Sequence, residues 1–416
     1  MNSRRSVVAL LASFLTSAMA TAALDTVLGI QVFAISERPL DLGLLGLVSF
    51  APAALLVLVT GSVADRFERR RVAATAMLAE AATATALFVY LGSTPRTVGP
   101  IFAFAFVFGA ARAFASPAVR ALPADIVGPE RVPWVVARTS ATWQVALILG
   151  PVLGGFLYAA NTRLPYVAIA LLALVGAVVI LLVHPVQVQP LTVGQPLVVA
   201  GEVVEPPSVR AQLTDAVEGF RFIRSQPIVL GAISLDLFAV LFGGAVALLP
   251  ALAEDRLHVG AVGIGWLRAA GGIGAAAVTL RLAVRPLHRH VGRWLLSAVA
   301  LFGVATIVLG VTRTYAIAFV AMLVLSGADA VSVFVRATLV PLVTPIEKRG
   351  RVLAVESVFI GASNELGAFE SGVAGQILGA AGAVVLGGAA TLAVALSWAR
   401  AFPALRSVDR FPTAPD

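Results

Sequence analysis

Long apolar runs separated by short polar breaks make up most of the chain. A helix needs about 20 apolar residues to cross the hydrocarbon core of a bilayer, because every backbone N–H and C=O must be paired within the segment. The runs do not alternate apolar and polar residues as the strands of a transmembrane β-barrel do. The pattern therefore predicts twelve transmembrane helices. We expect them at residues 7–35, 42–63, 72–91, 98–114, 135–158, 165–183, 228–252, 262–284, 294–311, 315–340, 352–378 and 382–398.

The longest polar stretch, residues 184–226, divides these runs into six and six. Within it, Leu213, Val217 and Phe220 share one face of a predicted helix, with Arg221 and Arg224 nearby. This pattern is typical of an amphipathic helix that lies on a membrane surface. We expect an N-terminal six-helix half at 1–183, a cytoplasmic linker with this helix at 184–226, a C-terminal six-helix half at 227–400 and a cytoplasmic tail at 401–416.

The two halves also resemble each other weakly. When the first half is shifted by 217 residues, Glu130 falls on Glu347 and Ser140 falls on Ser357. Transporters built from two parallel repeats bind their substrate near the middle of the membrane, between the repeats. The expected fold class is therefore an all-α membrane protein of two six-helix pseudo-repeats.

The basic residues in the breaks predict the orientation. With the N-terminus in the cytoplasm, 22 of the 30 Lys and Arg residues fall in cytoplasmic segments, 5 in outer loops and 3 inside spans. Because cytoplasmic loops carry the excess of Lys and Arg, both termini are expected in the cytoplasm. Arg4 and Arg5 before an apolar run also fit a cleaved signal peptide. That run is too long for one, and its removal would leave an odd number of spans.

The composition supports a membrane protein, with 59% hydrophobic residues, 12% charged residues and a mean hydropathy of +0.95. Soluble domains carry about 25% charged residues, so this chain lacks the polar surface that a soluble enzyme needs. The net charge of +8 would suit nucleic acid, but the loop arginines account for it and we expect no nucleic-acid partner. The absence of cysteine excludes disulfides, thiolate metal sites and a cysteine nucleophile.

Motifs for enzymatic chemistry are also missing from the sequence. There is no phosphate-binding loop for ATP, no serine-hydrolase elbow and no His-Glu-x-x-His pair. His288 and His290 could bind a metal, but they lie in a basic loop where membrane topology explains the charge. We expect no enzymatic activity, no metal and no cofactor.

The break after the second span has a glycine, then Ala-Asp-Arg, then a run of basic residues. An aspartate is favoured at a helix N-terminus, and the arginines can pair with carboxylates of the facing half. The segment resembles the signature loop of the major facilitator superfamily, with Glu68 where a second glycine is usual. The resemblance implies a latch that holds the cytoplasmic side shut. Its candidate residues are Gly61, Asp65, Arg66, Arg69 and Arg70.

The fifth predicted span contains Gly150, Pro151, Gly154 and Gly155. Small residues let helices approach closely, and a proline removes a backbone donor. The segment resembles the superfamily's antiporter motif, with Ala146 in place of its first glycine. In the family this motif accompanies export more than uptake; ordinary helix packing is the alternative interpretation.

Segments of the second half, including 249–253 and 364–372, resemble the superfamily branch of the enterobactin exporter and related siderophore and drug exporters. The same residue patterns occur with different substrates, so they identify the branch better than the cargo.

Charged residues inside spans cost about 3 kcal/mol each at the helix centre on insertion scales, so each needs a reason. In the superfamily, spans one, four, seven and ten line the cavity, and a basic residue in span four is linked to proton coupling. We expect Asp25 with Arg112, and Asp236 with Arg268, to exchange a proton for substrate; permanent salt bridges are the alternative. The candidate residues for coupling and the cavity are Asp25, Arg112, Asp236, Arg268, Asp329 and Arg336.

Three further carboxylates, Glu356, Glu365 and Glu370, lie in the eleventh span and are expected at a gate or seam of the second half. Glu80 lies on a span expected at the periphery, so a structural role is expected for it.

The expected function is proton-coupled export of an amphipathic small molecule, such as a siderophore or drug, by alternating access. The alternative is a lipid or lysolipid translocator on the same fold. The expected partners are the substrate, protons and membrane lipids. We expect a monomer in the bacterial inner membrane.

Overall fold

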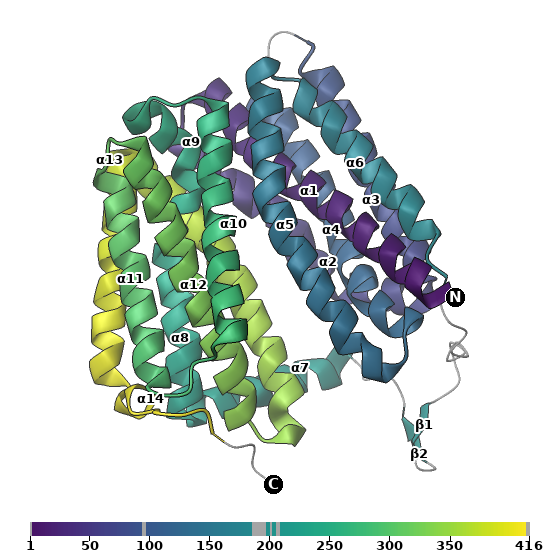
Figure 1. The fold of residues 1–416 in the computed structure, drawn as a ribbon, viewed down its shortest axis with the longest axis vertical. Coiled ribbons are helices and arrows are strands. Elements are labelled where there is room, and N and C mark those ends of the chain that lie inside the picture. Colours follow the sequence, from purple (N-terminus) through teal and green to yellow (C-terminus); the bar gives the residue numbers. More distant parts are fainter. Residues whose placement is uncertain (1, 94–96, 185–196, 200–201, 205–208, 413–416) are drawn as a thin grey trace. The chain divides into compact units, whose positions relative to one another are not determined.

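The computed structural model describes residues 2–93, 97–184, 197–199, 202–204 and 209–412. Within these ranges it does not describe the side chains of residues 2, 3, 57, 58, 62, 64, 65, 197–199, 202–204 and 209–214. The fold is a bundle of long helices (Figure 1).

The first six long helices follow one another with short connections. They are α1 (Asn2–Ser36), α2 (Pro39–Arg66), α3 (Arg69–Tyr90), α4 (Val98–Ile126), α5 (Val132–Ala160) and α6 (Leu164–Leu181), with a 3₁₀ turn η1 (Pro129–Arg131) before α5.

A short antiparallel pair, β1 (Leu197–Val199) and β2 (Glu202–Val204), precedes α7 (Val209–Ser225). The remaining elements are α8 (Pro227–Phe242), η2 (Gly244–Leu248), α9 (Leu249–Leu252), η3 (Ala253–Leu257), α10 (Ala261–Val284), α11 (Val291–Val311), α12 (Tyr315–Val343), α13 (Ile346–Ala401) and α14 (Pro403–Arg406). The helix α7 occupies the segment where an amphipathic helix is expected.

Eleven apolar stretches in the described part of the chain are long enough to cross a membrane. One of them, α13, has 56 residues and contains Gly379 at φ 74° and ψ 156°, a conformation outside the helical region. This break divides α13 into two spans, so the stretches provide twelve. It falls in the gap expected between residues 378 and 382, and the all-α, twelve-span fold class is confirmed.

The predicted fourth span is too short, because α4 continues from residue 114 to Ile126. This extension contains Pro117 and Pro123. In the structure the helix continues through both prolines, because Ala118, Val119 and Leu122 are buried in a cluster with residues of α1 and α3.

The chain forms two compact units, each with its own interior. Unit 1 comprises Met1–Val193 and Leu249–Gly272, and unit 2 comprises Gly194–Leu248 and Ile273–Asp416. The division differs from the expected boundary at residues 184–226, because α9 and the first part of α10 pack with α1 and α5 in unit 1.

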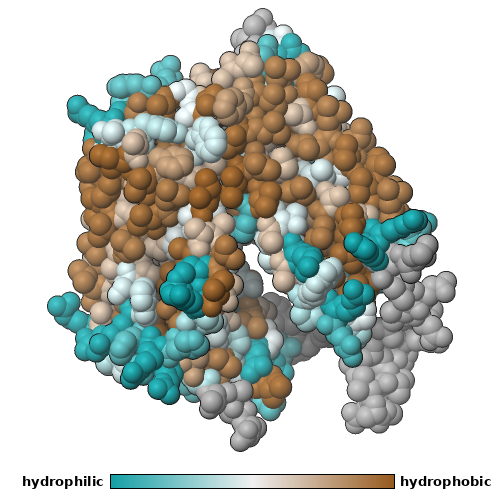
Figure 2. All heavy atoms as spheres, viewed as in Figure 1, coloured by the Kyte–Doolittle hydropathy of each residue, from teal (hydrophilic) through white to brown (hydrophobic). Residues whose placement is uncertain are grey.

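Apolar side chains fill the interior of each unit and also cover the helices outside it. Leu171, Val178 and Leu386 are each more than half exposed, and Figure 2 shows hydrophobic residues along the helices and hydrophilic ones toward their ends. Exposed apolar surface of this extent is typical of a membrane-facing protein.

Candidate functional site

A charged pair lies inside unit 1, between α1 and α4. Arg112 Nη1 is 3.6 Å from Asp25 Oδ2, and the two side chains are 45% and 47% exposed. These are the residues that the sequence pairs. At this distance the guanidinium keeps capacity for further hydrogen bonds, so the pair can exchange partners with water or a solute.

Arg268, from the unit 1 part of α10, lies near the same carboxylate. Asp25 is the charged group that acts on it, and a side chain at Gly29, one turn after Asp25, would be 3.7 Å from Arg268 Nη2. The buried Nε of Arg268 has no hydrogen-bond partner among the described residues. Arg268 thus groups with Asp25, and not with Asp236, with which the sequence pairs it.

Glu80 of α3 also lies near this pair. It is 1% exposed, and the charges that act on it are those of Arg112 and Asp25. From the sequence alone, a structural role on a peripheral span is expected for it. The sequence did contain a signal for a functional role, because Glu80 is an isolated carboxylate within an apolar helix.

Unit 2 contains a second, more deeply buried charged cluster. Arg336 Nη2 of α12 is 2.7 Å from Asp236 Oδ1 of α8, and Arg336 Nη1 is 3.6 Å from Glu356 Oε1 of α13. These three side chains are at most 8% exposed. Asp329, two turns before Arg336 on α12, acts on both Arg336 and Asp236. Two carboxyl groups therefore contact one guanidinium, and the charge of a third, Asp329, acts on it.

The helix that carries Asp236 is interrupted within its span. α8 ends at Phe242, a 3₁₀ turn and the short α9 follow, and a π turn completes the apolar stretch. A side chain at Gly244 would collide with the Gly367 carbonyl of α13. Irregular backbone at membrane depth occurs where it is buried in protein or lines a polar site, and Ala245, Leu248 and Leu249 of this segment are buried.

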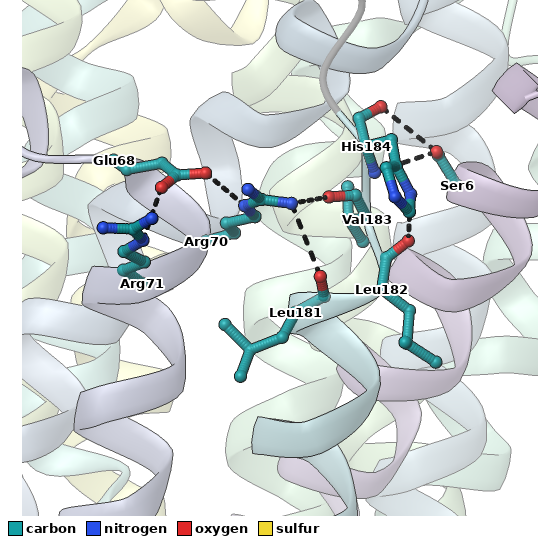
Figure 3. A network of polar contacts seen from close by, with 8 residues as sticks. All are labelled: Ser6, Glu68, Arg70, Arg71, Leu181, Leu182, Val183 and His184. Atoms are coloured by element: carbon teal, nitrogen blue, oxygen red, sulfur yellow. Dashed lines mark hydrogen bonds and ion pairs between the residues drawn. The ribbon is translucent and has the colours of Figure 1, made fainter.

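The end of unit 1 near the α2–α3 connection carries a polar network (Figure 3). Glu68, the variant residue of the loop, accepts a hydrogen bond from Arg70 Nε, and its Oε2 lies 2.6 Å from Arg71 Nε. Arg70 also donates to the carbonyls of Leu181 and Val183 at 3.4 and 2.9 Å, where α6 ends. Arg70 therefore satisfies carbonyl groups that a helix C-terminus leaves unpaired.

The other residues of the predicted latch are placed as follows. Arg69 Nη1 lies 2.6 Å from Asp125 Oδ1 of α4, within unit 1. Arg66, at the end of α2, is exposed, and Gly61 has open space around its Cα. The side chain of Asp65 lies outside the described residues. The described contacts of the loop thus join helices of one unit.

The glycines of the predicted antiporter motif are buried contact points of α5. Side chains at Gly150 and Gly154 would meet α1, at Ala22 Cβ (2.8 Å) and Val27 Cγ2 (3.0 Å). A side chain at Gly155 would be 2.5 Å from the Ala261 carbonyl of α10. The motif therefore acts as a packing surface for two helices at once; Pro151 is buried beside it.

The remaining candidates lie on α13. Glu370 and Glu365 are half-buried. Neither belongs to the Arg336 cluster as the described contacts define it. Among the residues that the structure describes, no group of three or more His, Cys, Asp or Glu side chains is placed to hold a metal ion.

Several solved structures share this fold. A bacterial homologue of the human lysosomal transporter Spinster, in an inward-facing and unoccupied conformation, is 15% identical, with 97% of this chain and 96% of that one covered and a TM-score of 0.68. A POT family transporter in complex with a thioalcohol-conjugated peptide is 11% identical (96% and 96% covered, TM-score 0.70). The human organic anion transporter MFSD10 (TETRAN) is 18% identical (96% and 100% covered, TM-score 0.59). At these identities the likeness shows the fold alone.

Sequence comparison identifies the family. No curated protein sequence matches the chain significantly. Residues 6–363 match the model of the Major Facilitator Superfamily. The chain therefore belongs to the major facilitator superfamily, whose members are secondary membrane transporters that work by alternating access.

Proposed function

We propose that the chain couples the movement of protons to the export of an amphipathic small molecule. The observation that carries the proposal is the cluster of Asp236, Asp329 and Glu356 around the single guanidinium of Arg336. Full ionisation would leave two uncompensated negative charges in a buried site, which is costly. The cluster is balanced when protons occupy the excess carboxyl groups, so it can bind and release them.

The energy source follows from this chemistry. A proton that moves down a potential of about 100 mV supplies roughly 2.3 kcal/mol, before any contribution from a pH difference. That energy suffices to concentrate a solute severalfold without ATP. Export, rather than uptake, is favoured by the resemblance of Gly150–Gly155 in α5 to the superfamily's antiporter motif.

The loop charges support a cytoplasmic location for the Lys- and Arg-rich ends of the helices. We propose the bacterial inner membrane as the location, with both termini cytoplasmic and the protein acting as a monomer. Substrates of the siderophore and drug type fit the proposal; their identity rests on the likeness of residues 249–253 and 364–372 to that branch.

Proteoliposomes with an internal pH dye test the proposal. Ethidium, a catecholate siderophore and a fluorescent lysophospholipid serve as probes under an imposed pH gradient. We expect ethidium or the siderophore to move against its gradient while protons move the other way. Movement of the lysophospholipid alone would support a lipid translocator instead, and transport that ignores the pH gradient would contradict proton coupling.

A further inference from the structure

Glu80 is a membrane-embedded carboxyl group that the proposed chemistry does not yet use. It is 1% exposed, and its Oε2 is fully buried without a hydrogen-bond partner in the described part of the chain. An ionised carboxylate in such a place would be very unfavourable, since its buried Oε2 accepts no hydrogen bond from the described residues. The neutral acid is the form that this site accommodates.

The depth of Glu80 in the unit matches that of the Asp25–Arg112 pair. Asp25 lies 11 residues before the end of α1, Glu80 lies 10 before the end of α3, and Arg112 lies 14 after the start of α4. At about 1.5 Å per residue, these positions are about 16, 15 and 21 Å from helix ends on the same side of unit 1.

The charges around Glu80 come from two neighbouring helices. Arg112 of α4 and Asp25 of α1 act on it, and Arg268 interacts electrostatically with Asp25. The span of α6, which also packs on α3, contributes only Tyr166 as an ionisable side chain. Among the described residues, Arg112 is therefore the cation that acts on Glu80 and also pairs with Asp25.

We propose that Glu80 is the enclosed proton store of unit 1 and that Asp25 is its exchange partner with the solvent. In the step, the Glu80 carboxyl loses its proton and the Asp25 carboxylate gains it. The Arg112 guanidinium moves from Asp25 to Glu80, so that one ion pair is broken and one is formed. The number of protons and the net charge stay the same. Asp25, which is 47% exposed, can then release the proton to water.

This inference rests on the proposed proton coupling, but its test needs no substrate. Infrared difference spectroscopy on the full chain in lipid nanodiscs detects the C=O stretch of a protonated carboxyl group that lacks a hydrogen bond. We expect this band at neutral pH, its loss in Glu80→Gln, and its retention in Glu130→Gln, which changes an exposed carboxylate. Glutamine has the shape of the neutral acid, so Glu80→Gln is expected to fold.

The relay itself is tested by the rate of band loss after a jump to alkaline pH. We expect Asp25→Asn to slow this loss about tenfold or more, because the exchange partner is gone. Arg112→Gln is expected to keep the band at alkaline pH, because the ionised Glu80 would have no counterion. An unchanged band in Glu80→Gln, or an unchanged rate in Asp25→Asn, would overturn the inference. A chain that shows these effects but moves no probe in proteoliposomes would contradict the proposed function instead.

Discussion

The charged sites of the two units use the same kinds of residue in different surroundings. In unit 1, Asp25 of α1 and Arg112 of α4 are 3.6 Å apart and nearly half exposed. In unit 2, Asp236 of α8 and Arg336 of α12 are 2.7 Å apart and at most 6% exposed. Both pairs join the first and fourth spans of a six-helix set. The difference teaches that the unit 1 pair is exposed as it stands, whereas the unit 2 pair is enclosed in a buried network.

The largest expected effect is a difference in the stability lost when Arg336 or Arg112 is replaced. Arg336→Gln leaves three buried carboxyl groups without their cation, and breaking a buried pair in this way costs about 3–5 kcal/mol. Arg112→Gln breaks a half-exposed pair, for which about 0–1 kcal/mol is expected. Thermal unfolding in detergent, followed by circular dichroism, measures both. Equal losses would show that the two sites are equally closed.

Helix contacts in unit 1 give the next effect. A Cβ at Gly155 would be 2.5 Å from the Ala261 carbonyl, so Gly155→Ala forces α5 and α10 apart at a cost of about 1–3 kcal/mol. Gly99→Ala is the matched control, because Gly99 has no atom within 4 Å of the position of a Cβ. We expect a lowered unfolding temperature only for Gly155→Ala. If both variants behave alike, the close approach is not a constraint.

The two units also differ in the arginine contacts that hold a helix end in unit 1 and the helix α7 in unit 2. Arg70 caps α6 in unit 1, and Arg351 of α13 in unit 2 pairs with Asp215 and Glu218 of α7. We expect Arg70→Ala to cost about 0.3–1 kcal/mol, as cations at helix C-termini do, and to speed amide exchange at residues 181–183. Arg351→Ala should speed amide exchange in α7 instead. Hydrogen exchange measured by mass spectrometry distinguishes the two variants. Faster exchange at both residues 181–183 and α7 in either variant would show that the two contacts are not independent.

The smallest expected effect is a pH dependence confined to unit 2. The backbone N–H of His290 donates to Asp409 Oδ1 at 3.1 Å and, with Arg289 and His290 nearby, lowers the pKa of this carboxyl. A lowered folded-state pKa means that the contribution is complete above the ordinary aspartate value of about 4 and is lost as pH falls through the lowered value. The backbone N–H groups of Val291 and Gly292 donate hydrogen bonds to the backbone of the C-terminal tail. We expect these amides to exchange faster once the pH has fallen below the lowered pKa of Asp409. In Asp409→Asn this pH-dependent rise in amide exchange should vanish. If the rise persists in that variant, another group causes it.

The sequence predicted most of the fold, because lipid imposes long apolar helices and loop charges mark their ends. The kink at Gly379 lies in the gap predicted between the spans 352–378 and 382–398. The continuation of α4 through Pro117 and Pro123 could not be predicted, because it depends on packing against neighbouring helices. The grouping of Leu249–Gly272 with unit 1 likewise depends on contacts between helices far apart in the chain.

The candidate site was predictable in its residue types but less so in its pairings. A charge within an apolar run is visible in the sequence, and Asp25 with Arg112 followed from their spans. Asp236 finds Arg336 rather than Arg268, because the partner depends on the rotation of each helix about its axis. The closeness of Glu80 to Arg112 depends on the packing of α3 against α4, which no spacing in the sequence reveals.

Proton flux in proteoliposomes tests the central claim most directly. Vesicles with an internal pH dye hold wild-type protein, Asp25→Asn or Asp236→Asn, and receive ethidium or a catecholate siderophore. We predict that substrate movement in wild type is accompanied by proton flux and that both variants, although folded, lose gradient-driven transport. Transport and proton flux at the wild-type rate in both variants would contradict the account.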